Sequence, residues 1–166
     1  MKKFIAFLFA AVLGTSLGLF TAAAYEVTQV TDETMASTYR KGDHVLVDRL
    51  LFADLAERDF ARGDVVVFAN PMYMETGEGD RMLKRIIGLP GEWVSIKDGI
   101  VHIDGVPLDE SAYLQGSRTG DMVEQYVSAG SYFVLGDNRM NSTDSRSETV
   151  GLVQKKDLQG KVIQQW

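Results

Sequence analysis

The sequence predicts a mostly β domain of antiparallel strands. Short apolar runs recur along the chain, and closely spaced turns rich in glycine and aspartate separate them, a pattern typical of such a fold. The clearest turn is Lys97-Asp98-Gly99, which lies between the apolar runs 93–96 and 100–103 and is a strong hairpin signal. With 166 residues, the chain is long enough for one compact domain and a short appendage.

Further strands are expected along the whole chain. The run from Arg81 to the Pro90-Gly91 turn is predicted to be a strand, and Val65–Phe68 to be a buried one because it is continuously apolar. The other expected strands are residues 25–30, 44–50, 106–108, 132–135 and 158–163. The expected connections are a linker at residues 51–61, a loop at residues 72–80 and an irregular polar surface excursion at residues 109–128.

The N-terminal segment, residues 1–24, is expected to lie outside the β domain, which covers residues 25–166. After two lysines, residues 4–24 carry no charge, and as a helix they would span about 30 Å of a bilayer. The lysines favour a cytoplasmic N-terminus, which would place the β domain on the outer side of the membrane. Two interpretations stay open: a retained single-pass anchor, or a signal peptide cut near Ala22-Ala23-Ala24.

The composition excludes several kinds of site. The chain has no cysteine, so it has no thiol nucleophile, no disulfide and no cysteine metal site. Its two histidines, His44 and His102, sit beside valines in expected strands, which argues against a histidine metal site. The net charge of -6 argues against nucleic acid as the main partner. No metal or cofactor is expected.

Lys84 is the first candidate catalytic residue. In a strand, alternate side chains share a face, so Lys84 is expected beside Met82 and Ile86. Apolar neighbours would remove water from the amine, lower its pKa and let it act as a general base. The simpler alternative is a lysine near the strand edge that extends its amine to water.

Two polar stretches could supply partners for this lysine. Residues 31–43 are rich in hydroxyl groups, among them Thr34, Ser37 and Thr38, and residues 136–146 are dense in Asn, Asp, Ser and Arg. A loop of the second kind can lock itself through hydrogen bonds from side chains to backbone. A hydroxyl activated by a lysine is a known form of nucleophilic catalysis that needs neither histidine nor metal.

Four stretches then resemble, in order, the motifs of bacterial type I signal peptidases, the membrane-bound serine/lysine proteases that cut signal peptides from exported proteins. They are residues 34–43, 62–68, 84–92 and 136–146. The first, Thr34-Met35-Ala36-Ser37-Thr38-Tyr39-Arg40-Lys41-Gly42-Asp43, is similar to the family's Ser-Met-x-Pro-Thr-Leu-x-x-Gly-Asp. The resemblance implies coiled antiparallel β-sheets behind one N-terminal transmembrane helix, with the active site near the membrane surface and no cofactor.

The resemblance also implies roles for individual residues. Lys84 corresponds to the general-base lysine, and Ser142 to the serine whose hydroxyl orients that lysine. The supporting positions are Met35, Asp137, Asn138, Asp144 and Arg146, of which the last two stiffen the loop around the site. The implied substrates are preproteins with small residues, usually alanine, at the first and third positions before the cut, and the implied partner surface is a lipid bilayer.

The chain departs from the family in its first motif. Thr34 stands where the family has its nucleophilic serine, Ser37 replaces the proline, and Asp32 lies where a serine or glycine is frequent. A carboxylate at that place would disfavour a developing oxyanion. Two functions therefore stay open: an endopeptidase that forms an acyl-enzyme on Thr34, or a degenerate relative that binds exported or surface proteins as an assembly factor. Self-cleaving repressors with a serine and a lysine are set aside, because they need a DNA-binding segment where this chain offers a membrane span.

Overall fold

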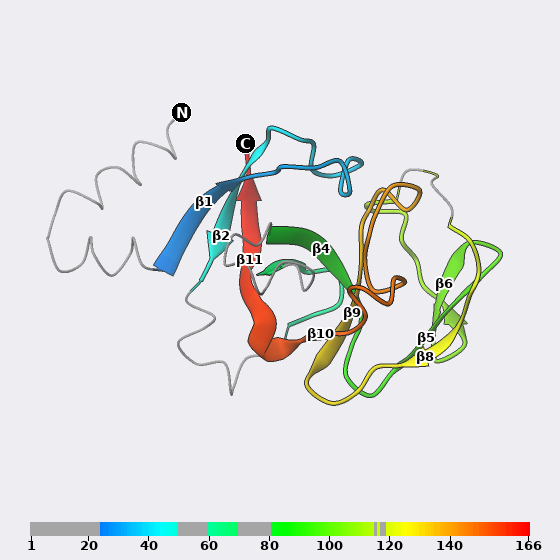
Figure 1. Ribbon diagram of the computed structural model, residues 1–166. Coiled ribbons are helices and arrows are strands. Elements are labelled where there is room, and N and C mark those ends of the chain that lie inside the picture. Colours follow the sequence, from blue (N-terminus) through cyan, green and yellow to red (C-terminus); the bar gives the residue numbers. More distant parts are fainter. Residues whose placement is uncertain (1–23, 50–59, 70–80, 115, 117–118) are drawn as a thin grey trace, which may run out of the picture.

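The computed structural model describes residues 24–49, 60–69, 81–114, 116 and 119–166, which form two antiparallel sheets (Figure 1). The larger sheet has the strand order β1-β2-β11-β3-β4-β9-β10, and the smaller has the order β7-β6-β5-β8. In chain order the elements are β1 (Tyr25–Gln29), β2 (His44–Asp48), β3 (Val65–Ala69), β4 (Arg81–Gly88), β5 (Trp93–Lys97), β6 (Ile100–Ile103), β7 (Val106–Pro107), β8 (Met122–Tyr126), β9 (Ser131–Leu135), β10 (Val153–Gln154), the short 3-10 helix η3 (Lys155–Asp157) and β11 (Leu158–Gln165). The prediction of a mostly β, antiparallel fold is confirmed.

The predicted irregular excursion at residues 109–128 is partly wrong, because Met122–Tyr126 forms β8 at the edge of the smaller sheet. An edge strand is paired on one side only and buries little, and Val123 is 88% exposed. Its sequence therefore lacks the apolar alternation that marks a strand. The prediction also missed β10, which has only two residues and is too short to show a period.

Three expectations fall largely outside the described residues. They concern the apolar segment at residues 4–24, of which only Ala24 is described, the connector up to residue 59, and the loop at residues 72–80. Within the described ranges, no helix combines the length and the apolar character that crossing a bilayer requires.

The hairpin predicted around Asp98-Gly99 is confirmed. Strands β5 and β6 pair in an antiparallel register that sets Lys97 opposite Ile100. Asp98 has a φ of 53° and Gly99 a φ of 73°, and positive φ at both central positions is the signature of the type I′ turn that Asp-Gly favours.

Strand β4, which carries Lys84, lies in the interior of the larger sheet (Figure 1). Antiparallel pairing sets Lys84 opposite Val66 of β3, and on the other side Arg85 pairs with Leu135 of β9. Every residue of β4 after Arg81 is buried. Because hydrogen bonds hold the strand on both sides, its backbone is a rigid support for the lysine side chain.

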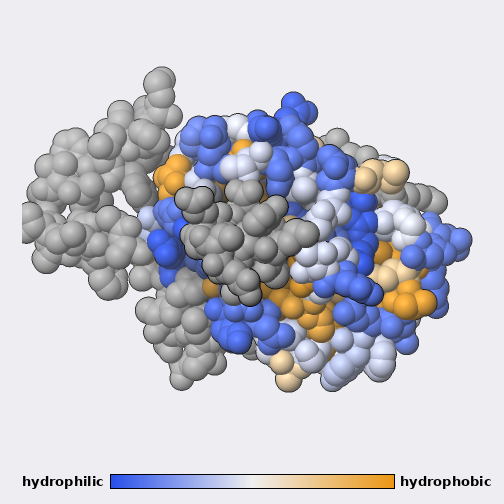
Figure 2. Space-filling model, viewed as in Figure 1, coloured by the Kyte–Doolittle hydropathy of each residue, from blue (hydrophilic) through white to orange (hydrophobic). Residues whose placement is uncertain are grey.

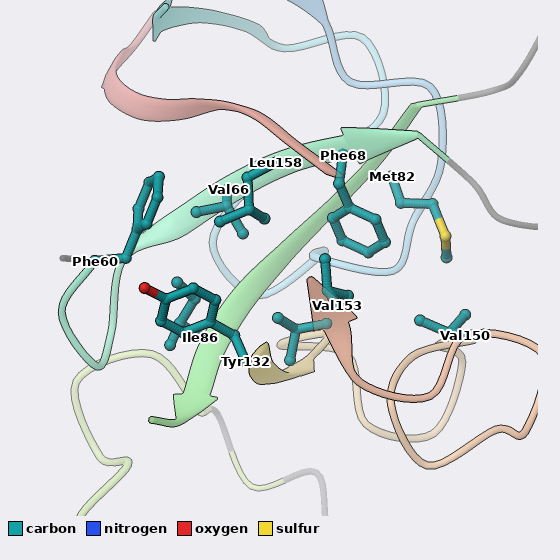
Figure 3. Close-up of a cluster of buried hydrophobic side chains, with 10 residues drawn as sticks. Phe60, Val66, Phe68, Met82, Ile86, Tyr132, Val150, Val153 and Leu158 are labelled. Atoms are coloured by element: carbon teal, nitrogen blue, oxygen red, sulfur yellow. The ribbon is translucent and has the colours of Figure 1, made fainter. Parts of the chain in front are cut away.

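Apolar side chains pack on both faces of this sheet. Figure 3 shows one cluster, in which Val66, Met82 and Ile86 meet side chains from β9, β10 and β11. Phe60 and Tyr132 add an edge-on aromatic pair there, with 5.7 Å between ring centroids. Val65 and Val67 of β3 and Leu83 of β4 belong to a second cluster, as the two-residue period of a strand requires.

Two further clusters attach the rest of the domain to the sheet. Met35 is fully buried among Val45, Leu83 and their neighbours, so the segment before β2 is packed against the sheet. Ile87 and Phe133 pack with β5 and β6, which joins the smaller sheet to the larger one. On the face drawn in Figure 2, hydrophilic side chains surround smaller apolar patches.

Candidate active site

Lys84 and Thr34 are in direct contact. The Nζ atom of Lys84 donates to Thr34 Oγ1 at 2.8 Å and to the carbonyl oxygen of Leu83 at 3.1 Å. The Lys84 side chain is fully buried, with 0% of its surface exposed. The alternative in which this lysine extends its amine to water is therefore wrong.

Burial changes the acidity of the Lys84 amine. Loss of hydration disfavours the ammonium form and lowers the pKa of Lys84, while the negative charges of Asp32, Asp144 and Asp137 raise it in part. The balance is a lowered pKa. A neutral amine, which is the form that a general base needs, is thus easier to reach than in a solvated lysine.

Local turns hold Thr34 in place. The N–H groups of Thr38 and Tyr39 both donate to the carbonyl oxygen of Met35, at 2.8 Å and 2.7 Å. The Met35 side chain is buried in the core, so the turn that follows Thr34 is fixed to the sheet. The threonine hydroxyl is therefore presented to β4 by a segment that packs tightly on it.

Asp32 contacts Thr34 twice. Its Oδ1 atom accepts a hydrogen bond from Thr34 Oγ1 at 2.7 Å and another from the Thr34 backbone N–H at 2.9 Å. A carboxylate that accepts from the backbone two residues later is a common turn arrangement. Here it brings a negative charge onto the candidate nucleophile.

The expected pair of Asp144 and Arg146 is present. Arg146 Nε donates to Asp144 Oδ1 at 2.7 Å, and Arg146 Nη2 donates to Asp144 Oδ2 at 2.8 Å. Asp144 also accepts from the Gly136 N–H at 3.0 Å, and Arg146 donates to the Arg139 carbonyl oxygen at 3.0 Å. These bonds join the two ends of the segment 136–146 into a stiff loop.

Asp137 lies at the centre of a second buried pair, with Arg85. Two hydrogen bonds of 2.8 Å and 2.6 Å join the Arg85 guanidinium to the carboxylate. Thr38 Oγ1 donates to the same carboxylate at 2.6 Å, and the Asp137 N–H points at the sulfur of Met35 at 3.4 Å. Sequence reasoning did not assign Arg85 a role, although its place next to Lys84 in a matched motif was the available signal.

Asn138 and Gly136 connect the polar loop to the nucleophile segment. The Asn138 N–H donates to the Thr34 carbonyl oxygen at 2.9 Å, and its side-chain amide donates to the Glu33 carbonyl oxygen at 3.0 Å. Gly136 lies so close that a Cβ atom there would be 2.5 Å from the Thr34 carbonyl oxygen and 2.2 Å from Ser142 Oγ. Only glycine allows this approach.

Ser142 lies beside the site without the expected hydrogen bond to Lys84. Its Oγ atom is buried and has no hydrogen-bond partner within the described part of the chain, and the Lys84 amine bonds to Thr34 and Leu83. Ser37 Oγ is likewise buried and unpartnered among those residues. The structure therefore brings together Thr34, Lys84 and the supporting residues, with Ser142 as a close neighbour.

A further buried pair behind the loop was missed by sequence reasoning. Arg139 makes two hydrogen bonds to Glu110, and Tyr113 donates to the same carboxylate at 2.9 Å. The Tyr113 ring also lies 4.2 Å from the Arg85 guanidinium carbon, which is a cation–π distance. No local pattern marks Glu110, because its segment reads as a polar surface loop.

Asp32 also lines a groove of about 380 Å³. Its walls come from β1 and the residues after it (Glu26, Thr28, Gln29, Val30, Thr31, Asp32), from β4 (Arg81, Met82, Leu83) and from Val45 and Val67. Two of these residues, Glu26 and Arg81, form an ion pair. Among the residues that the structure describes, no group of three or more His, Cys, Asp or Glu side chains is arranged to hold a metal ion.

Comparisons with known proteins give a consistent result. The model of the family "Signal peptidase, peptidase S26" matches residues 1–166. The signal peptidase I of Leptolyngbya laminosa is 34% identical over 156 residues, which cover 89% of this chain and 71% of that protein. The signal peptidase I of Bacillus licheniformis is 33% identical over 156 residues, covering 86% of this chain and 76% of the relative.

A solved structure is also similar. The crystal structure of a signal peptidase I from Enterococcus faecalis superposes with a TM-score of 0.51 and is 33% identical, covering 64% of this chain and 98% of that one. The chain belongs to the signal peptidase family, peptidase S26.

Proposed function

We propose that this protein is a membrane-bound endopeptidase that removes signal peptides from exported preproteins, with Thr34 as nucleophile and Lys84 as general base. The observation that carries the proposal is the 2.8 Å contact between the Lys84 amine and the Thr34 hydroxyl. It lies in a site that buries the lysine completely. Nucleophile and base within hydrogen-bond reach, in a dry site, are what hydroxyl activation requires.

The reaction follows from these groups. Neutral Lys84 takes the Thr34 hydroxyl proton while Oγ1 forms a bond to the scissile carbonyl carbon, and the Thr34 N–H stabilises the oxyanion. The C–N bond then breaks, and the Lys84 ammonium gives its proton to the leaving amine. Water, deprotonated by Lys84, attacks the acyl-enzyme ester and releases the second product with regeneration of the Thr34 hydroxyl.

Supporting residues keep the two reacting groups in register. The polar loop, residues 136–146, fixes the backbone of Thr34 through Asn138, and its rigidity comes from the Asp144 ion pair. The buried Ser142 hydroxyl is unpartnered among the described residues. It is available to accept a hydrogen bond from Lys84 when substrate binding rearranges the amine.

The groove gives the substrate a place to bind. An extended peptide laid along β1 would have its last residue before the cut near Asp32, where the groove meets the site. In an extended chain the first and third residues point to the same side, so both would face the same wall. Small side chains at these positions, as in an Ala-x-Ala site, would let the backbone approach Thr34. We place the site on the outer side of a bilayer, with residues 4–24 as the anchor.

The first test uses the full chain in lipid vesicles with a preprotein that carries an Ala-x-Ala site. The parent is expected to cleave it, whereas Thr34→Ala and Lys84→Met are expected to lose cleavage while keeping their circular dichroism spectra. Ser37→Ala is the matched control, because it removes a nearby hydroxyl outside the proposed chemistry. Cleavage by Thr34→Ala at the parent's rate would overturn the proposed nucleophile.

One result would turn attention to the assembly-factor function. If the parent does not cleave but Thr34→Ser does, the machinery is sound and the threonine is not a competent nucleophile. Binding of the same preprotein by the parent, measured without turnover, would then be the activity to characterise.

A further inference from the structure

The Thr34 hydroxyl donates its hydrogen bond to Asp32 in this structure. Thr34 Oγ1 has two close partners, Asp32 Oδ1 at 2.7 Å and Lys84 Nζ at 2.8 Å. An ionised carboxylate can only accept hydrogen bonds, and a hydroxyl has only one proton to give. Thr34 therefore donates to Asp32, and Lys84 must be the donor to Thr34. A lysine base needs the opposite arrangement, in which the Thr34 hydroxyl donates its proton to the Lys84 amine.

The same carboxylate oxygen also occupies the Thr34 backbone N–H, at 2.9 Å. In the proposed function this N–H stabilises the oxyanion, so it has to be free when a scissile carbonyl arrives. Asp32 thus engages both groups of Thr34 that acyl transfer uses.

We propose that Asp32 is a self-inhibitory residue, which holds Thr34 and Lys84 in an inactive arrangement until a bound substrate displaces its carboxylate. The inference rests on the proposed function of the site and identifies which of its residues limits the reaction. Asp32 also lines the groove, whose walls do not include Thr34, and it contacts Thr34 directly. A peptide that fills the groove would therefore meet this carboxylate on its way to Thr34.

The negative charge of Asp32 favours the inactive arrangement, as its hydrogen bonds do. Of the charges around Lys84, that of Asp32 does most to raise the lysine pKa against the effect of burial, and so favours the inactive ammonium form. Among the described residues, the other charges that act on the amine are those of Asp137 and Asp144, and each of these is paired with an arginine, Arg85 and Arg146 respectively. Within the described residues Asp32 has no such cation partner. Removing the Asp32 carboxylate should therefore lower the pKa of Lys84 more than removing either of the other two carboxylates.

The experiment compares the parent with Asp32→Ser and Asp32→Asn, using full-length protein in lipid and the Ala-x-Ala preprotein. The matched control is Glu33→Gln, a neighbouring exposed carboxylate that touches neither Thr34 nor Lys84 through its side chain in any contact of the structure. Cleavage is measured as kcat/KM between pH 6 and 10, and the Lys84 amine is titrated by NMR with lysine labelled at Cε. The Lys84→Met protein assigns its resonance.

For Asp32→Ser we expect kcat/KM at neutral pH to rise about tenfold or more, because it frees the oxyanion donor. In both Asp32 variants the rising limb of the pH profile should move to lower pH, together with the Lys84 titration. Glu33→Gln should match the parent in both measurements. A structural role alone would not move the lysine titration.

Two results would overturn the proposal. If Asp32→Ser cleaves less well than the parent, Asp32 assists the reaction and is itself a candidate base for Thr34. If the Lys84 titration is the same in parent and variants, Asp32 does not control the amine, whatever the cleavage rates are. If no protein cleaves, Thr34→Ser included, the proposed function fails, and the lysine titration alone still decides whether Asp32 holds the amine in its charged form.

Discussion

Replacing Lys84 with methionine should abolish catalysis and yet make the fold more stable. Methionine fills a similar volume without an amine, so the buried polar group is removed and no cavity is left. At pH 6, where folding must either bury the charged amine or deprotonate it, we expect Lys84→Met to raise the free energy of unfolding by about 1–3 kcal/mol.

The pH dependence of this gain is the sharper part of the prediction. The folded-state pKa of Lys84 is lowered, mainly by desolvation, so between that pKa and about 10.4 the unfolded chain binds one more proton than the folded protein. Parental stability therefore rises with pH in this window by about 1.4 kcal/mol per pH unit. Lys84→Met lacks this term, and its advantage should shrink at the same rate.

Urea unfolding followed by far-ultraviolet circular dichroism, at pH 6, 8 and 10 in one detergent, measures both effects. Lys97→Met, at an exposed position at the end of β5, is the control and should change the free energy of unfolding by less than about 0.5 kcal/mol. An advantage of Lys84→Met that stays constant from pH 6 to pH 10, or a variant less stable than the parent at pH 6, would show that the amine is not desolvated and would remove the basis for a lysine base.

Two further changes test the supports of the site. Asp137→Asn leaves a buried guanidinium without its anion and should lower the free energy of unfolding by about 3–5 kcal/mol, whereas Glu26→Gln at a more exposed ion pair should cost less than about 1 kcal/mol; equal costs would contradict the buried-pair argument. Gly136→Ala places a Cβ atom 2.5 Å from the Thr34 carbonyl oxygen. A shift of about 1 Å at the nucleophile should reduce cleavage about a hundredfold, while Gly120→Ala, with nothing within 4 Å of its Cβ, should match the parent in the same peptidase assay.

Much of the fold could be predicted because its signals are local. The Asp98-Gly99 dipeptide favours the two positive φ angles of a hairpin turn, and β3 is recognisable in the sequence as a continuous apolar run. Strand β8 could not be predicted in this way. Among the described strands it pairs only with β5, and it exposes Val123, so its sequence carries no hydrophobic period.

In the candidate site, too, only the features with a local sequence signal could be predicted. Strand alternation placed Lys84 beside Met82 and Ile86 but left open whether its amine is buried or reaches water, and the resemblance of its motif pointed to Thr34. The bonds that Arg85 and Arg139 make depend on segments far away in the chain, and no local pattern encodes such pairs. The direction in which the Asp32 carboxylate points is set by side-chain geometry at one turn, which spacing along a sequence does not contain.

The link between Asn138 and the Thr34 carbonyl oxygen has a consequence for the timing of activity. The two residues are separated by more than half of the chain, and Lys84 lies between them. A ribosome makes Thr34 and Lys84 well before the loop that holds Thr34 in place. Until that loop has been synthesised and docked, the two residues are present but not aligned. If they are the reacting pair, as proposed above, a newly made chain gains its peptidase activity only after the loop docks.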